Sequence, residues 1–292
     1  MNAAIFCFSG TGNTLKVAEE YAARLISSGH GAQVLKMENT DPGMDISGFD
    51  LIGIAYPVHA FGAPVIVEKF VKGLNNQPAK KRAFIIKTSG EPLKLNNASS
   101  GRIIRLLSRR NFEVTNEYHY VMPYNIMFRH SDNMAYKMWR TAKALVPVHL
   151  NEILSGTPSK LKPPFLGRLV SAVMRIEHWG GRFNGKRYKT ESTCIKCGKC
   201  VKNCPAGNIG LKDGKIVFGG NCLMCMRCAF YCPQNAVKTG LFNGWKVNGA
   251  YDFDNFNENE VQTHEKFCRK AYKRYFEQSE KKIEEYKANS LK

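Results

Sequence analysis

The residues with the clearest chemistry are eight cysteines that form one four-cysteine motif, which occurs twice. Each copy has two gaps of two residues and then one gap of three, and a proline follows the fourth cysteine. The copies comprise Cys194, Cys197, Cys200 and Cys204, and then Cys222, Cys225, Cys228 and Cys232. Thiolates are soft, anionic ligands that suit iron in both oxidation states. The motif therefore predicts two 4Fe–4S clusters.

The unequal gaps of the motif also predict which cysteines share a cluster. The three-residue gap carries the fourth cysteine past its own cluster to the neighbouring one. We therefore expect one cluster to be held by Cys194, Cys197, Cys200 and Cys232, and the other by Cys222, Cys225, Cys228 and Cys204. A pair of zinc sites is the alternative, but zinc modules usually pair one two-cysteine knuckle with a second pair farther along. The repetition predicts two similar loop–helix halves that share both clusters.

A second candidate site is the turn Ser9-Gly10-Thr11-Gly12-Asn13-Thr14, which follows an apolar run and precedes a helical pattern. Backbone N–H groups at the start of a helix favour an anion, and the hydroxyl side chains add donors. The turn has no lysine, so it suits a monoester phosphate. A dinucleotide fingerprint is a weak alternative, because Leu15 occupies the position of its third glycine.

Two further loops are expected to meet this turn. One is Tyr56-Pro57-Val58-His59-Ala60-Phe61-Gly62, which offers aromatic faces to a flat ring, and the other is Ser89-Gly90-Glu91, which offers backbone donors. Both follow predicted buried strands, and such loops meet at the carboxyl edge of a doubly wound sheet, at the switch point of a 2-1-3-4-5 strand order. His59 fits equally well as a donor to the ring and as a neutral loop residue.

The elements that must position these sites alternate between strand and helix. The apolar patterns predict strands at 3–8, 33–35, 49–55, 82–87 and 113–121, and helices at 15–25, 64–74, 100–110 and 133–154. Pro147 is expected to kink or split the last of these helices. The alternation predicts an α/β fold with a five-stranded, doubly wound parallel sheet.

Composition divides the chain into four segments. We expect a sheet domain at 1–154, a basic linker at 155–190, a small α+β domain with the cysteines at 191–240, and a helical tail at 241–292. The amphipathic stretch Phe165–Trp179 in the linker suits either a membrane surface or packing against the domains, and we expect packing. The tail is expected to dock through the aromatic residues Phe267, Tyr272, Tyr275 and Phe276.

The charge of the chain is strongly basic, at +19 overall. The excess is densest near the cysteines, because residues 155–190 hold eight Lys/Arg and one acidic residue. Anionic clusters and a phosphate account for part of it, and the remainder is expected to attract acidic partners. Nucleic acid is a weaker alternative without a reader motif. No apolar run approaches the ~20 residues of a membrane span. Without a recognisable leader, the cysteines fit the reducing cytoplasm, where we expect the protein.

Together these motifs resemble a known family. Ser9–Thr14 is similar to the phosphate loop of flavodoxins, residues 1–154 resemble a flavodoxin domain in length and element order, and Cys194–Cys232 resembles a bacterial two-cluster ferredoxin. The whole chain resembles the flavodoxin–ferredoxin fusion proteins, often called ferrodoxins, of mostly anaerobic bacteria. The resemblance implies FMN, with its ring between Tyr56–Gly62 and Ser89–Glu91. Flavodoxins and ferredoxins are typically acidic, so the basic charge implies a different docking surface.

These observations lead to an expectation about function. We expect an electron-transfer protein that passes electrons between FMN and two 4Fe–4S clusters, and between these and redox partner proteins with acidic docking faces. The alternative is a flavin-dependent iron–sulfur reductase acting directly on a small molecule. A nucleic-acid-binding redox sensor and a flavin-free scaffold are two further alternatives. No Ser–His–Asp, HExxH or paired-carboxylate pattern stands out, so hydrolysis has no support and no catalytic residue is assigned.

Overall fold

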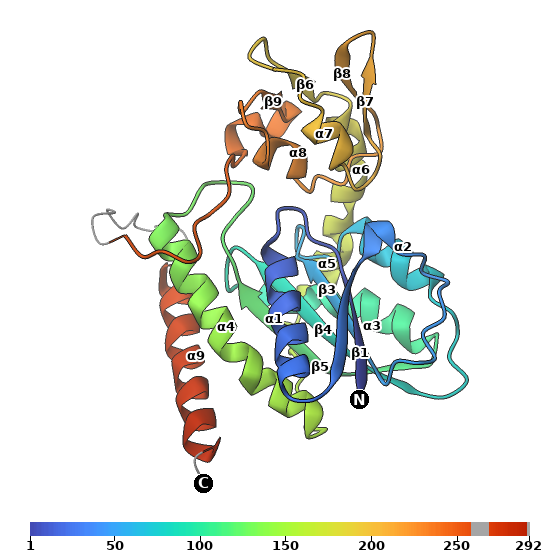
Figure 1. The fold of residues 1–292 in the computed structure, drawn as a ribbon, viewed down its shortest axis with the longest axis vertical. Coiled ribbons are helices and arrows are strands. Elements are labelled where there is room, and N and C mark those ends of the chain that lie inside the picture. Colours follow the sequence, from blue (N-terminus) through green and yellow to red (C-terminus); the bar gives the residue numbers. More distant parts are fainter. Residues whose placement is uncertain (258–268, 291–292) are drawn as a thin grey trace.

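The protein has two globular parts joined by a helical segment (Figure 1). The computed structural model describes residues 1–257 and 269–290. The larger part, at the bottom of the view, is a sheet covered by helices, and the smaller part above it carries the cysteine motifs. Among the described residues, no helix is both long enough and apolar enough to cross a membrane.

The larger part is built on a five-stranded parallel sheet with the order β2-β1-β3-β4-β5. This confirms the predicted flavodoxin-like α/β fold, in which the strand order reverses beside β1. The switch point brings the loops after β1 and β3 to one edge of the sheet. The strands are β1 (Asn2–Cys7), β2 (Gly31–Lys36), β3 (Leu51–Pro57), β4 (Lys81–Ser89) and β5 (Phe112–Val121).

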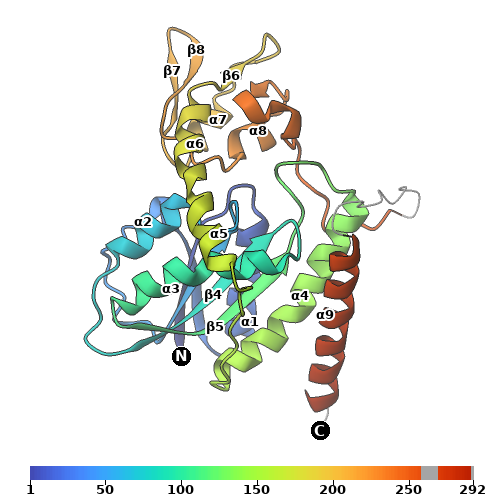
Figure 2. The same ribbon diagram turned by 180° about the vertical axis from the view of Figure 1, so that it is seen from behind.

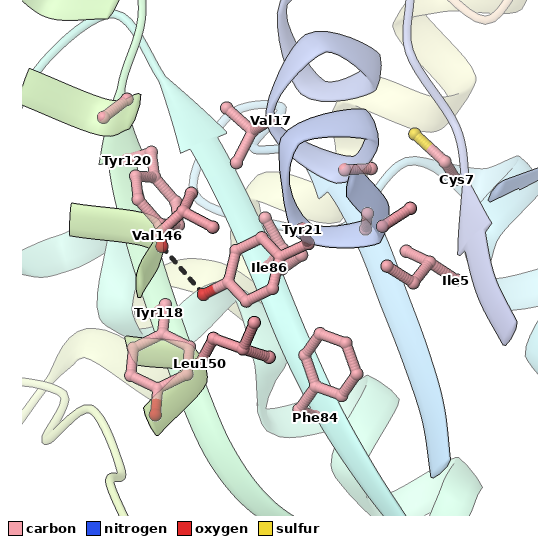
Figure 3. Close-up of a cluster of buried hydrophobic side chains, with 14 of the residues drawn as sticks. Ile5, Cys7, Val17, Tyr21, Phe84, Ile86, Tyr118, Tyr120, Val146 and Leu150 are labelled. Carbon is pink, nitrogen blue, oxygen red and sulfur yellow. Dashed lines mark hydrogen bonds between the residues drawn. The ribbon is translucent and has the colours of Figure 1, made fainter. Parts of the chain in front are cut away.

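Helices cover both faces of the sheet, because its central strands are apolar on both sides. One face is covered by α1 (Asn13–Ser27) and α4 (Asp132–Leu154), and the other by α2 (Val65–Gly73) and α3 (Gly101–Ser108). Figure 3 shows the first face, where the hydroxyl groups of Tyr21 and Tyr120 lie 2.7 Å apart within the apolar core. Short 3-10 turns lie at η1 (Met37–Asn39) and η2 (Lys94–Ser100).

The last helix of the larger part and the final helix of the chain run side by side (Figures 1 and 2). α4 continues through Pro147 without splitting. α9 (Arg269–Ser290) packs on it through Tyr272, Tyr275 and Phe276, as the aromatic pattern predicted. The backbone N–H of Val121 donates to Tyr275 Oη over 3.2 Å, so α9 also contacts the end of β5. The fourth predicted docking residue, Phe267, lies outside the described residues.

A nearly continuous helical run connects the two parts, and Figure 2 shows it along the outside of the sheet domain. It comprises α5 (Gly167–Val173), the 3-10 turn η3 (Met174–Ile176) and α6 (Glu177–Gly185). Its small residues face the protein: a Cβ on Gly167 would lie 3.4 Å from the Cβ of Ala98, and one on Gly185 would lie 2.3 Å from the Cβ of Cys222. The linker therefore packs against both parts, as expected.

The smaller part consists of short elements around the cysteines. They are β6 (Lys189–Thr190), α7 (Lys199–Lys202), β7 (Ile209–Lys212), β8 (Lys215–Phe218), α8 (Arg227–Phe230), β9 (Val237–Lys238) and the 3-10 turn η4 (Gly240–Trp245). β6 pairs with β9, and β7 pairs with β8. β6 falls in the segment predicted as linker, because a two-residue strand has no periodicity to reveal it.

Candidate functional site

The eight motif cysteines gather around two small cavities in the smaller part. One cavity is lined by Cys194, Cys197, Cys200 and Cys232. The other is lined by Cys204, Cys222, Cys225 and Cys228. Each set takes three cysteines from one copy of the motif and the fourth from the other copy. The arrangement fits the crossed sharing expected from the three-residue gap.

The two copies of the motif have matching backbones. Lys196 and Met224 occupy equivalent positions and have left-handed φ values of 55° and 50°. The Gly198–Met226 pair likewise has φ values of 72° and 60°, and a short helix begins after each member. The equivalent Sγ atoms of Cys204 and Cys232 each accept a hydrogen bond over 3.2 Å from the backbone N–H of the residue four positions later. These donors are Asn208 and Ala236. Such bonds stabilise a thiolate.

The second cysteine set is the more buried of the two. Burial raises the pKa of Cys225 to about 12, and it raises the pKa of Cys222 and Cys228 as well. Coordination to iron removes the proton from a thiol and replaces the missing solvation. The buried set therefore suits a cluster, whose iron atoms supply the positive charge that the apolar surroundings lack.

A large cavity lies at the carboxyl edge of the sheet, where the loops after β1, β3, β4 and β5 meet. Its volume is about 630 Å³, within the usual range for ligand pockets. The residues at the end of β1 provide hydroxyl and amide groups, and the other loops provide a largely apolar wall. Among the described residues, no Lys or Arg side chain lines it. An anion here would be held by N–H and hydroxyl donors.

The predicted phosphate turn has the local geometry of a helix entrance. Gly12 has a left-handed φ of 100° and caps α1, which begins at Asn13. Its N–H donates to Ser9 Oγ over 3.1 Å. The buried hydroxyl of Thr14 lies 2.7 Å from that of Thr88 at the end of β4, which ties the turn to a second strand. Ser9, Gly10, Thr11, Asn13 and Thr14 all line the cavity.

Most of the predicted ring-contacting residues also line this cavity: Pro57, Val58, His59, Phe61, Ser89, Gly90 and Glu91. Gly12, Tyr56 and Gly62 do not. Tyr56 is still part of β3, which carries its ring into the core beneath α2 and α3, where it is fully buried. This ring therefore cannot stack on a ligand in the cavity, and Phe61 is the aromatic residue of the loop that remains available.

The loop after β4 is held by a network of buried polar groups. His119 Nε2 lies 2.7 Å from Ser89 Oγ, and burial together with the charge of Lys87 lowers the pKa of His119 to about 3. Burial also raises the pKa of Glu91, whose carboxylate accepts hydrogen bonds from Tyr124 and Asn96. From α9, Tyr272 Oη donates to the Gly90 carbonyl oxygen. The C-terminal helix thus supports a cavity loop.

Several cavity residues were not predicted from the sequence. One group follows β5 and comprises Met122, Pro123, Tyr124, Asn125, Ile126 and Met127. The carboxyl-edge rule applied to the fifth strand would have found it. The other group comes from the linker run and the smaller part, and comprises Met174, Ile176, Glu177, Gly180, Met224, Phe242 and Trp245. No local pattern marks these residues, because they reach the cavity only through the packing of the two parts.

The smaller part is hydrogen-bonded to the predicted phosphate turn. The Arg227 guanidinium donates to the carbonyl oxygens of Ser9 and Gly10 over 2.6 and 3.0 Å, and it pairs with Glu38 at 2.6 Å. Tyr231 Oη donates to the Thr11 carbonyl oxygen over 2.7 Å. A Cβ on Gly10 would lie 2.4 Å from the carbonyl oxygen of Cys225. The turn therefore touches the second cysteine motif directly.

Comparison with known proteins supports the assignment of the smaller part. Residues 186–237 match the family model described as a 4Fe-4S dicluster domain, which indicates two 4Fe–4S clusters and a redox role. No curated protein is similar enough to the chain to count as a match. The chain thus joins a flavodoxin-like domain to a ferredoxin-type domain.

Solved structures resemble about half of the chain. A flavodoxin from Streptococcus pneumoniae is 17% identical, and the alignment covers 52% of this chain and 99% of that one, with a TM-score of 0.40. A flavodoxin from Archaea is 15% identical, with coverage of 53% and 99% and a TM-score of 0.38. Rubredoxin:oxygen oxidoreductase from Desulfovibrio gigas is 15% identical, with coverage of 53% and 36% and a TM-score of 0.39.

Proposed function

We propose that this chain transfers electrons between an FMN in the 630 Å³ cavity and two 4Fe–4S clusters, and between these and redox partner proteins. The observation that carries the proposal is the contact between the two sites. Met224 lines the cavity, and it lies between Cys222 and Cys225, which line the second cysteine cavity. A flavin and a cluster held by these residues would be close neighbours, as electron transfer between them requires.

The residues of the larger cavity fit FMN. Ser9, Thr11 and Thr14 offer hydroxyl groups to the phosphate at the start of α1, where the helix dipole favours an anion. Pro57, Val58 and Phe61 offer apolar surface to a ring, and Gly90 keeps its loop close to the cavity, because a Cβ there would lie 2.3 Å from the Tyr124 ring. Met174, Ile176 and Trp245 would exclude water from the opposite side.

Bound FMN supplies one- and two-electron chemistry, and each 4Fe–4S cluster supplies one-electron chemistry. The chain's contribution is therefore the order of the sites. The cysteine set of Cys204, Cys222, Cys225 and Cys228 would lie next to the flavin. The set that includes Cys197 would form the outer end, where Cys197 and Ile195 are exposed. The lysines Lys196, Lys199 and Lys202 lie in this motif, and they favour an acidic partner.

Anaerobic purification of the full chain tests the proposal, followed by assays of iron, sulfide, zinc and extracted flavin. About eight iron atoms per chain are expected for two 4Fe–4S clusters, together with about one FMN, as for a single flavodoxin-like site. Zinc in place of iron would contradict the cluster assignment, and protein without flavin would contradict the role of the cavity.

A steady-state assay separates a carrier from a reductase. The reduced protein is mixed with quinones, nitro compounds or free flavins, and the rate is followed as a function of their concentration. A carrier should show no saturable substrate among them. Saturation at a definite substrate concentration would replace the carrier proposal with direct reduction of a small molecule.

A further inference from the structure

The linker run α5–η3–α6 exposes a continuous apolar stripe. Five large side chains on it are more than half exposed: Leu169 at 61%, Val173 at 62%, Ile176 at 70%, Trp179 at 72% and Phe183 at 58%, and Phe165, just before the run, is exposed at 98%. They are spaced by three or four residues, so they lie on one face of the helix. The opposite face contains Gly167, Gly181 and Gly185, which are buried against the two parts of the protein. Ordinary amphipathic packing would bury the apolar face instead.

Basic residues flank this stripe. Arg168, Arg175 and Arg182 follow one another at intervals of seven residues, which places them along one side of the helix. Arg175 forms an ion pair with Glu68, with 3.1 Å between its Nη2 and Glu68 Oε2, whereas Arg168 and Arg182 are exposed. Residues 155–190 contain eight Lys/Arg and only one acidic residue, Glu177. Glu177 Oε1 lies 3.6 Å from His59 Nδ1, and both residues line the large cavity.

We propose that this stripe binds the surface of an anionic lipid bilayer. An interfacial helix has Trp, Phe and Leu on one face and Lys or Arg beside them, and it lies in the plane of the headgroups. The run from 167 to 185 provides this arrangement over about 28 Å at 1.5 Å per residue. Arg182 and Arg187 lie over the rings of Trp179 and Phe183, at 5.8 and 3.9 Å. Tryptophan rings of this kind favour the boundary between lipid and water.

Charge distinguishes the bilayer from a second copy of this chain. Two copies joined through the stripe would bring two strongly basic segments together, and their repulsion would oppose association. An anionic headgroup layer neutralises the same charges, and each Lys or Arg near such a surface adds to binding. If the protein binds in this way, the large cavity would lie close to the bilayer, because Ile176 belongs both to the stripe and to the cavity lining.

Vesicle sedimentation with the purified, cofactor-loaded full chain tests this proposal. The probes are phosphatidylcholine vesicles with and without phosphatidylglycerol, at low and high salt. We expect sedimentation with the anionic vesicles that weakens with salt, because charge attraction acts through a screened potential. Replacing both Trp179 and Phe183 with Ser should lower the partition constant at least tenfold. An Ile26→Ser control, which alters a residue exposed at 58% on α1, should bind like the wild type.

Two further measurements make the test specific. Charge reversal in Arg168→Glu/Arg182→Glu should weaken binding to anionic vesicles by an order of magnitude or more, since each basic residue is worth roughly fivefold. Trp179→Phe should keep binding but lose the blue shift of tryptophan fluorescence on vesicle addition. Failure to sediment with either vesicle would overturn the proposal. An equal loss of vesicle binding in the Ile26→Ser control would also overturn it. So would a concentration-dependent dimer that the double variant at Trp179 and Phe183 abolishes while its vesicle binding stays unchanged.

Discussion

At the scale of single residues, the fourth cysteine of each motif is the one that connects the two halves. Cys204 lies with Cys222, Cys225 and Cys228, although the first of these is 18 positions farther along the chain. Its Sγ also accepts the N–H of Asn208 at 3.2 Å. A thiolate in this position would serve the proposed cluster next to the large cavity and not the other one. Its removal should therefore affect one cluster selectively.

The first prediction follows for Cys204→Ser. A serine oxygen is a harder and less readily ionised ligand than a thiolate, so the cluster of the second motif should be lost or converted while the other persists. Iron content should fall from about eight to about four per chain, with one set of cluster signals left in electron paramagnetic resonance. Cys7→Ala is the control, because Cys7 is buried in β1 and lines neither of the two cysteine cavities. Equal loss of both clusters would contradict crossed sharing.

The second prediction concerns acid stability and His119. The pKa of His119 is about 3 in the folded protein, because burial and Lys87 disfavour its charged form, whereas in the unfolded chain it is about 6.5. Between these values the unfolded state binds one more proton, so this residue makes stability fall as pH falls from about 6.5 toward 3. The slope is about 1.4 kcal/mol per pH unit.

Thermal unfolding of wild type and His119→Gln between pH 7 and pH 5 measures this contribution. The variant should be less stable at pH 7, because the contact with Ser89 changes, but its unfolding temperature should fall less steeply with acid. His30→Gln, at a partly exposed position, should keep the wild-type slope. Parallel pH profiles for the wild type and His119→Gln would show that His119 is not the titrating group.

At the scale of elements, the turn between β1 and α1 has two neighbours. It faces the large cavity on one side and the second cysteine motif on the other. Arg227 and Tyr231 donate to its carbonyl oxygens, which leaves its N–H groups free of these two side chains. Gly10 is the point of closest approach, since any side chain there would meet the Cys225 carbonyl. One short turn thus links the proposed phosphate site to the second cysteine motif.

The third prediction tests this link with Gly10→Ala. The added Cβ would lie 2.4 Å from a backbone oxygen that cannot rotate away, so the turn or the motif must shift. Such overpacking costs about 1–3 kcal/mol. Flavin titration of the deflavinated protein should show an FMN Kd raised roughly tenfold, since 1.4 kcal/mol corresponds to that factor. Gly101→Ala is the control, because nothing lies within 4 Å of its Cβ position. An unchanged Kd in Gly10→Ala would contradict the close contact.

At the scale of the whole molecule, charge is distributed unevenly over a chain of net charge +19. The sheet domain carries less of the excess, and the linker and the cysteine region carry most of it. A partner that approaches the outer cysteine set meets lysines on the same motif. The long-range attraction of acidic proteins would steer them to this end, and added salt would screen it.

The fourth prediction is that electron transfer to an acidic acceptor protein depends strongly on salt. Stopped-flow rates with an acidic ferredoxin as acceptor should fall about tenfold or more between 50 and 500 mM salt, as steered association does. The double variant Lys196→Gln/Lys199→Gln should be slower at low salt, whereas Lys80→Gln, exposed just before β4 on the sheet domain, should not. Electron-transfer rates that depend neither on salt nor on these lysines would show that the docking surface lies elsewhere.

The sequence by itself determined the features that depend on local spacing. The cysteine gaps predict two clusters because a few residues of loop limit where each thiolate can reach. Apolar runs bounded by turns predict buried strands, and their alternation with helices predicts the doubly wound sheet that the observed strand order confirms. Ser9–Thr14 could be predicted as a phosphate turn because such a turn needs its glycines and hydroxyls at fixed positions on a strand–helix junction.

Only the tertiary structure decided how these parts meet. Residues such as Met224 and Trp245 reach the large cavity across contacts between distant segments, and no periodicity encodes such contacts. Tyr56 looked like a loop residue until β3 proved to extend through it. The helix Phe165–Trp179 was visible as amphipathic, but its pattern could not show which face is buried. Close packing against both parts of the protein required glycines, so the apolar face was left exposed.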